Sequence, residues 1–219
     1  MESALEETRR VLDEEQRPYA LIGGLAISAR ATPRFTHDVD FALFCTDAEA
    51  EGLVGSFVRR GWAVDALLMT KSTNRIATVR LTPPRSKVLV DLLFDFTGIE
   101  RDIVTSATDA LVRDGQTMPV ATRAHMIAMK VLAFRPKDKV DVDYLLDRAT
   151  KPEIAVARRA LAEMARAGKE PKRDLVGDLD ELLAVRAARP VEFVKVPPSR
   201  WPKGWTRPPK KRPSKKSGR

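Results

Sequence analysis

Two aspartates one residue apart form the pattern in this sequence that most directly suggests chemistry. Asp38 and Asp40 belong to the segment 38–44, in which polar and apolar residues alternate as they do in a strand. Side chains two residues apart on a strand point to the same face, so we expect the two carboxylates side by side. Neighbouring carboxylates repel each other unless a cation lies between them, and Mg²⁺ commonly joins protein carboxylates to substrate phosphates. The pattern therefore suggests a magnesium site, although the solvated face of an edge strand would also produce it.

A third aspartate lies within a strongly apolar strand. Asp91 interrupts the segment 87–94, which otherwise consists mostly of Val, Leu and Phe. A charge in such a run is costly unless it is paired or binds a metal ion. Asp91 is therefore either a further ligand of the same metal site or the partner of a cation such as Arg80 on the preceding strand.

A pair of glycines joins a short apolar strand to a helix. Gly23 and Gly24 follow the expected strand 19–22 and precede an expected helix at 25–31. Glycine lets backbone N–H groups approach an anion closely, and the start of a helix adds partial positive charge. The turn predicts a cradle for phosphate, with a tight strand-to-helix turn that binds nothing as the structural alternative.

The elements that must position these residues change in character along the chain. Capping boxes at 3–6 and 46–49 predict two helices, the first running to about Gln16 and the second ending at Gly61. Alternating or apolar runs predict strands near 19–22, 38–44, 62–69, 75–81 and 87–94. The Asp114-Gly115 step predicts a small hairpin. Helical periodicity predicts helices at 122–135, 138–149, 152–167 and 174–188.

A run of strands followed by a run of helices predicts an α+β fold, in which a mixed β-sheet is flanked by helices and followed by a C-terminal helical region. We expect a sheet domain at 1–121 and a helical region packed on it at 122–190. A basic, proline-rich tail at 191–219 completes the chain.

Positive charge is concentrated in that tail. The net charge is +9, and the segment from Lys195 onward carries ten Lys or Arg residues and no acid, which leaves 29 basic and 30 acidic residues before it. Trp201 and Trp205 are interspersed among these cations. We expect the tail to be disordered or extended and to contact RNA through phosphates and base stacking. A tail that only increases solubility would have the same composition.

Composition excludes several classes of protein. The single cysteine, Cys45, is incompatible with a disulfide framework or a zinc knuckle and favours a reducing compartment. The acidic N-terminus does not resemble a signal peptide, and no apolar run approaches the roughly 18 residues that cross a bilayer. We therefore expect a cytoplasmic protein without a membrane partner.

The ordered glycines and acids resemble a known superfamily. Polymerase-beta-like nucleotidyltransferases share a Gly-Gly or Gly-Ser turn after a strand, an acidic pair and a third acid, and residues 19–95 contain these features in that order. A second stretch resembles the AbiEii-like nucleotidyltransferase toxins, in which a helix lysine precedes a basic-Asp-x-x-Asp motif. Here these residues are Lys130, Lys137, Asp138 and Asp141, with Lys137 at a position where the family more often has Arg.

The resemblance implies a Mg²⁺-dependent enzyme that transfers a nucleoside monophosphate from an NTP to an acceptor hydroxyl and releases pyrophosphate. It implies a metal site made of Asp38, Asp40 and Asp91, and a role for Asp91 in accepting or orienting the attacking hydroxyl. The residues that it implies for binding the phosphates and supporting the site are Gly23, Gly24, Ser28, Lys130, Lys137 and Asp138.

The acceptor and the partners are also expectations from the resemblance and the tail. RNA such as tRNA is the favoured acceptor, and a cognate antitoxin or toxin chain is an expected partner. Two alternatives stay open at this point: an enzyme that modifies a protein hydroxyl, and a catalytically inactive module that binds nucleic acid or acts as an antitoxin.

Overall fold

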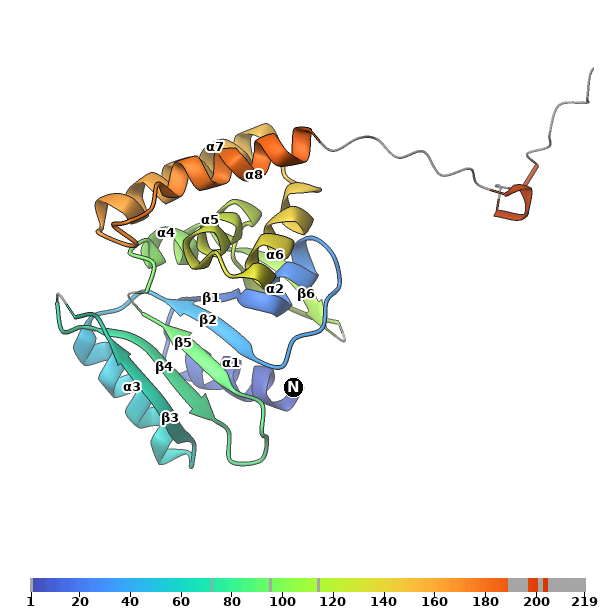
Figure 1. The fold of residues 1–219 in the computed structure, drawn as a ribbon. Coiled ribbons are helices and arrows are strands. Elements are labelled where there is room, and N and C mark those ends of the chain that lie inside the picture. The colour runs from blue at the N-terminus through green and yellow to red at the C-terminus, as the bar shows by residue number, and fades with distance from the viewer. Residues whose placement is uncertain are drawn as a thin grey trace, which may run out of the picture.

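A mixed β-sheet forms the centre of the protein. The computed structural model describes residues 2–71, 73–94, 96–113, 115–188, 197–200 and 203–204. Its seven-stranded sheet has the strand order β3-β4-β5-β2-β1-β7-β6 (Figure 1). The strands are β1 (Tyr19–Ile22), β2 (Val39–Leu43), β3 (Ala63–Met69), β4 (Ile76–Thr82), β5 (Val90–Leu93), β6 (Thr108–Arg113) and β7 (Gln116–Val120).

Parallel and antiparallel pairs both occur, as the sequence predicts. Strand β2 lies between β1, which is antiparallel to it, and β5, which is parallel. Strand β3 pairs with β4 at one edge and is exposed along its whole length. The parallel register of β2 and β5 makes Asp40 and Asp91 direct neighbours. The sheet therefore brings together two acids that are far apart in the sequence.

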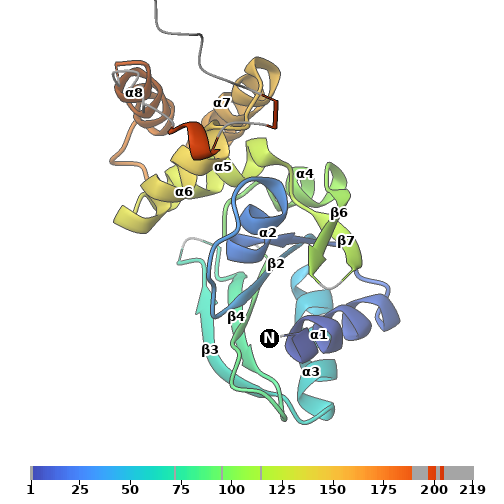
Figure 2. The same cartoon turned by 90° about the vertical axis from the view of Figure 1, so that its right-hand side faces the viewer.

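The helices gather at two ends of the molecule. Helices α1 and α3 contact each other at one end, and α5 to α8 lie at the other end (Figures 1 and 2). The helices are α1 (Glu2–Glu14), α2 (Gly23–Arg30), α3 (Asp47–Arg59), α4 (Glu100–Thr105), α5 (Arg123–Ala133), α6 (Pro136–Leu146), α7 (Lys151–Arg166) and α8 (Leu175–Ala187). The four C-terminal helices confirm the predicted helical region, with ends that differ by up to three residues.

Helix α5 connects this helical region to the sheet. It packs against α6 and α7 on one side and against α2 on the other. Its apolar residues Ile127, Ala128 and Val131 are fully buried. Because α2 begins with the glycine pair and α5 carries Lys130, this packing places two of the predicted phosphate-binding features near each other.

Capping residues and a glycine, all visible in the sequence, mark the ends of several helices. The predicted capping box of α3 is present: the Glu49 N–H donates to Thr46 Oγ1, and the Glu49 carboxylate accepts from the Thr46 N–H. Gly61 follows this helix with a φ of +84°, as expected of a glycine that ends a helix. The first capping box is wrong in position, because α1 already begins at Glu2 and Ser3 lies within it.

Two short helices differ from the sequence prediction. Helix α2 begins at Gly23, so the glycine pair forms its first turn instead of preceding it. Helix α4 has no predicted counterpart, because six residues are too few to show a helical stripe. Thr97 and Glu100 form a hydrogen-bonded turn at the start of α4, whose N-cap is Ile99. The Glu100 carboxylate accepts from Thr97 Oγ1 at 2.8 Å and from the Gly98 N–H at 2.9 Å.

The basic tail predicted at 191–219 lies almost wholly outside the described residues. Only 197–200 and 203–204 are described within it, and Pro198–Arg200 forms one 3₁₀ turn. In the part of the chain that is described, no helix has the length and apolar character needed to cross a membrane. The division into three parts at 121 and 190 stays a prediction.

Candidate active site

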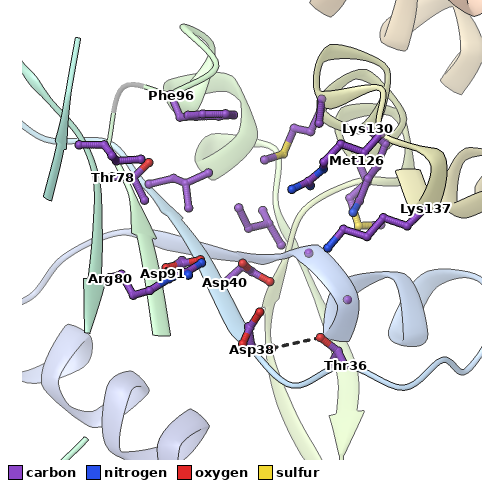
Figure 3. Close-up of a pocket in the computed structure, with 18 of the residues that line it drawn as sticks. Thr36, Asp38, Asp40, Thr78, Arg80, Asp91, Phe96, Met126, Lys130 and Lys137 are labelled. Carbon is purple, nitrogen blue, oxygen red and sulfur yellow. Dashed lines mark hydrogen bonds and ion pairs between the residues drawn. The ribbon is translucent and has the colours of Figure 1, made fainter. Parts of the chain in front are cut away.

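A pocket of about 420 Å³ lies between the sheet and the helical region (Figure 3). Strands β1 to β5, helices α2, α5 and α6, and the loop between α2 and β2 all contribute to its lining. The predicted site residues that line it are Gly23, Gly24, Asp38, Asp40, Asp91, Lys130 and Lys137. Two other predicted residues, Ser28 and Asp138, lie outside the lining.

Asp40 is packed directly against the glycine pair. A Cβ atom added at Gly23 would overlap the Asp40 carboxylate, and Gly23 has a φ of +66°, where side chains are disfavoured. A Cβ at Gly24 would lie 2.6 Å from the Thr36 side chain. Both glycines are therefore needed for the first turn of α2 to lie so close to the acidic strand and to the loop that precedes it.

The electrostatic surroundings of Asp40 disfavour its charge. Burial raises the pKa of Asp40, and the neighbouring charge of Asp91 raises it further, to about 6, against the opposing effect of Lys130. Asp38, two residues earlier on the same face, adds a smaller effect of the same sign. Such a group binds a proton more readily than an ordinary aspartate, and a divalent cation at the same place would stabilise its ionised form.

Arg80 holds Asp91 by both carboxylate oxygens. Arg80 Nε donates to Asp91 Oδ1 at 2.8 Å, and Arg80 Nη2 donates to Asp91 Oδ2 at 2.7 Å. The two residues face each other in the antiparallel register of β4 and β5. This bidentate geometry is the strongest form of the arginine–carboxylate pair, and it raises the pKa of Arg80. The pairing of Asp91 with Arg80 was one of the two alternatives that the sequence allows.

The acidic pair fits a magnesium ion better than the full triad does. Mg²⁺ binds oxygen ligands, keeps several of its waters and commonly needs only one or two carboxylates together with substrate phosphates. Asp38 and Asp40 satisfy this requirement, and the raised pKa of Asp40 reflects negative charge that lacks compensation. Among the described residues, no three acidic, histidine or cysteine side chains are grouped closely enough to hold a metal ion on their own. Asp91 accordingly fits a role beside the metal more readily than a role as its ligand.

Lys130 extends into the pocket from α5 and is anchored by two buried acids. Its Nζ atom lies 3.0 Å from Asp138 Oδ1 and 2.8 Å from Asp141 Oδ2. Both aspartates lie on α6 and are almost completely buried. The Lys-plus-Asp-x-x-Asp pattern thus has a physical explanation: the two acids neutralise and position a lysine that would otherwise be a buried, unpaired charge.

The same acids also position two arginines that the sequence analysis did not identify. Arg135 Nε donates to Asp138 Oδ2 at 2.6 Å, and Arg34 Nη1 lies 3.4 Å from Asp141 Oδ1. Both arginines line the pocket. Burial would raise the pKa of Asp138, but hydrogen bonds from Arg135 and Lys130 outweigh it, and the pKa is lowered. No local pattern marks Arg34, because its partner is about a hundred residues away in the sequence.

Ser28 supports the site from outside the pocket. The Arg34 N–H donates to Ser28 Oγ at 3.2 Å, and the Ser28 hydroxyl lies within hydrogen-bonding distance of the Gly24 and Arg34 carbonyl oxygens. These contacts tie the loop that carries Arg34 to helix α2. Ser28 therefore positions the loop in this structure, which differs from the direct phosphate contact that the resemblance implies.

The first turn of α2 is open toward the pocket. Ile22 precedes the helix and makes no side-chain cap, and the first turn contains no acid. Gly23 and Gly24 line the pocket. Backbone N–H groups at such a helix start, together with the helix dipole, favour a bound anion.

The remaining wall of the pocket is apolar. It is formed on the sheet side by residues from β1, β3, β4 and β5 and the segment after β5, and on the helical side by residues of α5. The apolar residues are Ile22, Ala66, Leu68, Leu93, Phe96, Met126, Met129 and Ala133, and Thr78 lies among them. Sequence reasoning misses this wall, because isolated apolar residues on several strands cannot be distinguished from ordinary core residues.

Several solved structures resemble the fold at low sequence identity. The antibiotic-resistance factor ANT(2″)-Ia matches with a TM-score of 0.46 and 16% identity, covering 84% of this chain and 94% of that one. The lincomycin-bound lincosamide antibiotic adenylyltransferase LnuA matches with a TM-score of 0.43 and 11% identity, covering 68% and 98%. JHP933 from Helicobacter pylori matches with a TM-score of 0.40 and 16% identity, covering 85% and 91%.

Comparison with curated protein sequences yields no match. The model of the family described as "Nucleotidyl transferase AbiEii toxin, Type IV TA system" matches residues 5–203, which is most of the chain. This match confirms the resemblance that the glycine pair, the acids and the lysine motif predict. The chain belongs to the AbiEii family of nucleotidyltransferase toxins.

Proposed function

We propose that this nucleotidyltransferase uses Mg²⁺ to transfer a nucleoside monophosphate from an NTP to a hydroxyl group of RNA. Its family makes it a nucleotidyltransferase of a toxin–antitoxin system, and the metal and the acceptor are the proposed parts. One observation carries the proposal: in a single pocket, an acidic pair with a raised Asp40 pKa lies between an uncapped helix start and an anchored lysine.

The triphosphate fits the helical side of the pocket. The first turn of α2 offers backbone N–H groups there, and Lys130, Arg135 and Lys137 supply positive charge. Lys130 is held by Asp138 and Asp141, so it does not need to be ordered when the nucleotide binds. A pre-organised cation of this kind reduces the entropic cost of binding the phosphates.

Asp38 and Asp40 would hold the magnesium ion at the edge of this phosphate site. When bound, Mg²⁺ would neutralise charge on the phosphate oxygens and help to orient the α-phosphate. The protein residues then contribute mainly by position. The acidic strand, the helix start and Lys130 converge on one place, where the α-phosphate would lie.

Asp91 is the proposed acceptor of the proton of the acceptor hydroxyl. The acceptor oxygen forms a bond to the α-phosphorus, while the bond from this phosphorus to the oxygen of the leaving pyrophosphate breaks and its electron pair stays with pyrophosphate. Arg80 occupies one lone pair on each Asp91 oxygen, and further lone pairs stay available for the hydroxyl. Arg80 therefore orients Asp91 without preventing it from accepting a proton.

RNA is the acceptor class that charge favours. The pocket lining contains Lys137 and four further cations that are paired with aspartates, namely Arg34, Arg80, Lys130 and Arg135. The excess positive charge therefore comes mainly from the sequence after the helical region. The sequence adds ten Lys or Arg residues from Lys195 onward. A polyanion would be attracted to these charges, and a cognate antitoxin remains the expected regulatory partner of a toxin in this family.

Labelled nucleotides test the proposal directly. Purified protein is incubated with each of four α-labelled NTPs, Mg²⁺ and total tRNA, and the products are separated into RNA and protein. We expect label on RNA, no label without Mg²⁺, and background label with Asp38→Asn. The matched control is Asp109→Asn, which changes an exposed aspartate outside the pocket and should leave labelling unchanged. Label on polypeptide would favour modification of a protein hydroxyl, and equal background in wild type and Asp38→Asn would refute the enzymatic proposal.

A further inference from the structure

The positions of the cations determine where the acceptor must lie. In Figure 3, Lys130 and Lys137 lie on one side of Asp38 and Asp40. The pyrophosphate leaves from the side of these cations, because they stabilise its charge. In an in-line displacement the attacking oxygen approaches from the opposite side of the phosphorus. The acceptor must therefore occupy the part of the pocket on the sheet side of the carboxylates.

That part of the pocket has a distinct chemical character. Figure 3 places Thr78, Phe96 and Asp91 on the sheet side, away from Lys130 and Lys137. Leu68, from the edge strand β3, completes the wall. Asp91 is the only acid among the described residues that line this side, and Arg80 already neutralises it.

Two large apolar side chains of this wall are accessible to a ligand. Leu68 is 55% exposed and Phe96 is 43% exposed. An aromatic ring that is accessible beside a reactive centre can stack on a planar ligand. This side of the pocket does not favour a polycationic acceptor, because it contains Arg80 and its acid, Asp91, is already paired with that arginine.

We infer that this wall, defined by Leu68, Thr78 and Phe96, is a subsite for the base of the 3′-terminal nucleotide of the RNA acceptor. The inference rests on the proposed function and deepens it. The terminal base stacks on Phe96 and lies against Leu68, which places the ribose of the same nucleotide beside Asp91. Its 3′-oxygen then forms the new bond to the α-phosphorus, its proton passes to Asp91, and pyrophosphate leaves toward Lys130.

A nucleobase is the occupant that these observations favour. Stacking on an aromatic side chain is available to every base, and it contributes about 1–3 kcal/mol per base, or roughly 5- to 150-fold in affinity. The wall offers few hydrogen-bonding groups for discriminating between bases. The subsite therefore predicts an enzyme that requires a terminal base but tolerates several bases.

An acceptor without its terminal base separates this inference from the proposed function. Two RNA oligonucleotides of one sequence are compared, one intact and one with an abasic 3′-terminal nucleotide that keeps its hydroxyl. For wild type, we expect kcat/KM for the abasic acceptor to be roughly 5- to 150-fold lower than for the intact one. In Phe96→Ala, kcat/KM for the intact acceptor should fall to the value that wild type shows for the abasic acceptor. The variant should therefore use the two acceptors with nearly equal kcat/KM.

Other variants exclude a general structural effect. Phe96→Tyr keeps the ring and should restore the preference for the intact acceptor, and Leu68→Ala should weaken it partially. The KM for the NTP should be unchanged in all three variants. Phe35→Ala is the matched control, because Phe35 is 76% exposed and lies outside the pocket lining. Thermal unfolding of each variant establishes that it folds.

The possible failures are distinguishable. If wild type labels the intact RNA and Phe96→Ala keeps the full preference over the abasic acceptor, the subsite is wrong while the proposed function stands. If wild type itself does not distinguish the two acceptors, the subsite is also wrong. If wild type labels no RNA, or labels only protein, the proposed function fails and the subsite fails with it.

Discussion

Asp40 on β2 is partly buried and Asp138 on α6 is fully buried, and the two aspartates belong to the two sides of one site. Asp138 accepts hydrogen bonds from Lys130 and Arg135, which lower its pKa in spite of burial. Burial and the charge of Asp91 instead raise the pKa of Asp40 to about 6. The difference suggests a separate role for each acid: Asp138 holds Lys130 and Arg135 in place, whereas under the proposed function Asp40 would bind a cation from solution.

The largest expected effect is the loss of catalytic activity when Asp40 is replaced. Asp40→Asn should lower kcat by about 10³-fold or more, because it removes a charged ligand of the proposed metal site while keeping the shape of the side chain. Labelling of RNA at saturating NTP and Mg²⁺ measures this loss. A variant with more than a tenth of wild-type activity would show that Asp40 does not serve the metal.

The second largest effect is the loss of folding stability when Asp138 is replaced. Asp138→Asn should lower the free energy of unfolding by about 3 kcal/mol, since it leaves Lys130 and Arg135 without their shared carboxylate. Chemical denaturation at pH 7 measures the change. Asp13→Asn is the control, because Asp13 pairs with Arg9 on the surface of α1, and loss of such a pair costs less than about 1 kcal/mol. Equal effects of the two substitutions would remove the distinction between Asp138 and a surface acid.

The stability effect should have the opposite sign at Asp40. The pKa of Asp40 is about 6 in the folded state, above its ordinary value of 3.8, so the folded protein binds the proton more tightly. This contribution to the free energy of unfolding is fully present below about pH 4 and is lost as the pH rises through 6. Asparagine cannot ionise, so the Asp40→Asn variant does not lose this stability. At pH 7.5 its free energy of unfolding should exceed that of wild type by up to about 3 kcal/mol. The gain should vanish near pH 4. Thermal unfolding from pH 4 to 8 without divalent ions tests the sign.

Added Mg²⁺ sharpens the same comparison. It should raise the unfolding temperature of wild type at pH 7.5 and leave that of Asp40→Asn nearly unchanged, because only the ionised pair binds the metal. An equal response in both proteins would place the metal elsewhere.

The smallest expected effect concerns Arg80, which acts through Asp91. Arg80→Met should lower kcat by about tenfold with little change in the KM for NTP, since Lys130 and Lys137, which are proposed to bind the phosphates, lie on the other side of Asp38 and Asp40. Arg80→Lys should recover only part of the loss, because lysine cannot form the bidentate pair. The exposed Arg85 provides the control substitution to Met.

A double variant tests whether Arg80 has a role of its own. If Arg80 acts by orienting Asp91, then Arg80→Met combined with Asp91→Asn should be no less active than Asp91→Asn alone. Additive losses would instead assign Arg80 a direct contact with substrate.

The sequence predicts the secondary-structure elements of the fold more completely than the residues of the site. The strands and the four C-terminal helices follow from periodicity, and the α3 capping box and Gly61 follow from local hydrogen bonding and glycine conformation. Helix α4 is missing from the prediction because its six residues carry no stripe, although Thr97 and Glu100 mark its start. Nine site residues could be named, and seven of them line one pocket. Arg34 could not be named because its partner Asp141 is distant in the sequence, and Phe96 could not be named because only the fold shows that it lines the pocket. Arg135 is three residues from its partner Asp138, but the sequence does not show that its side chain reaches the pocket.

Strand geometry alone determines that Asp38 and Asp40 share a face, since the alternation of side chains is built into an extended backbone. The sequence likewise determines that Gly23 and Gly24 admit a close approach, because they lack Cβ atoms. Only the tertiary structure decides that Asp91 lies beside Asp40 and is bound by Arg80, since both contacts depend on the register between separate strands. It also decides that Asp138 and Asp141 neutralise Lys130. Buried charges take the partners that packing brings within reach, and packing is a property of the whole chain.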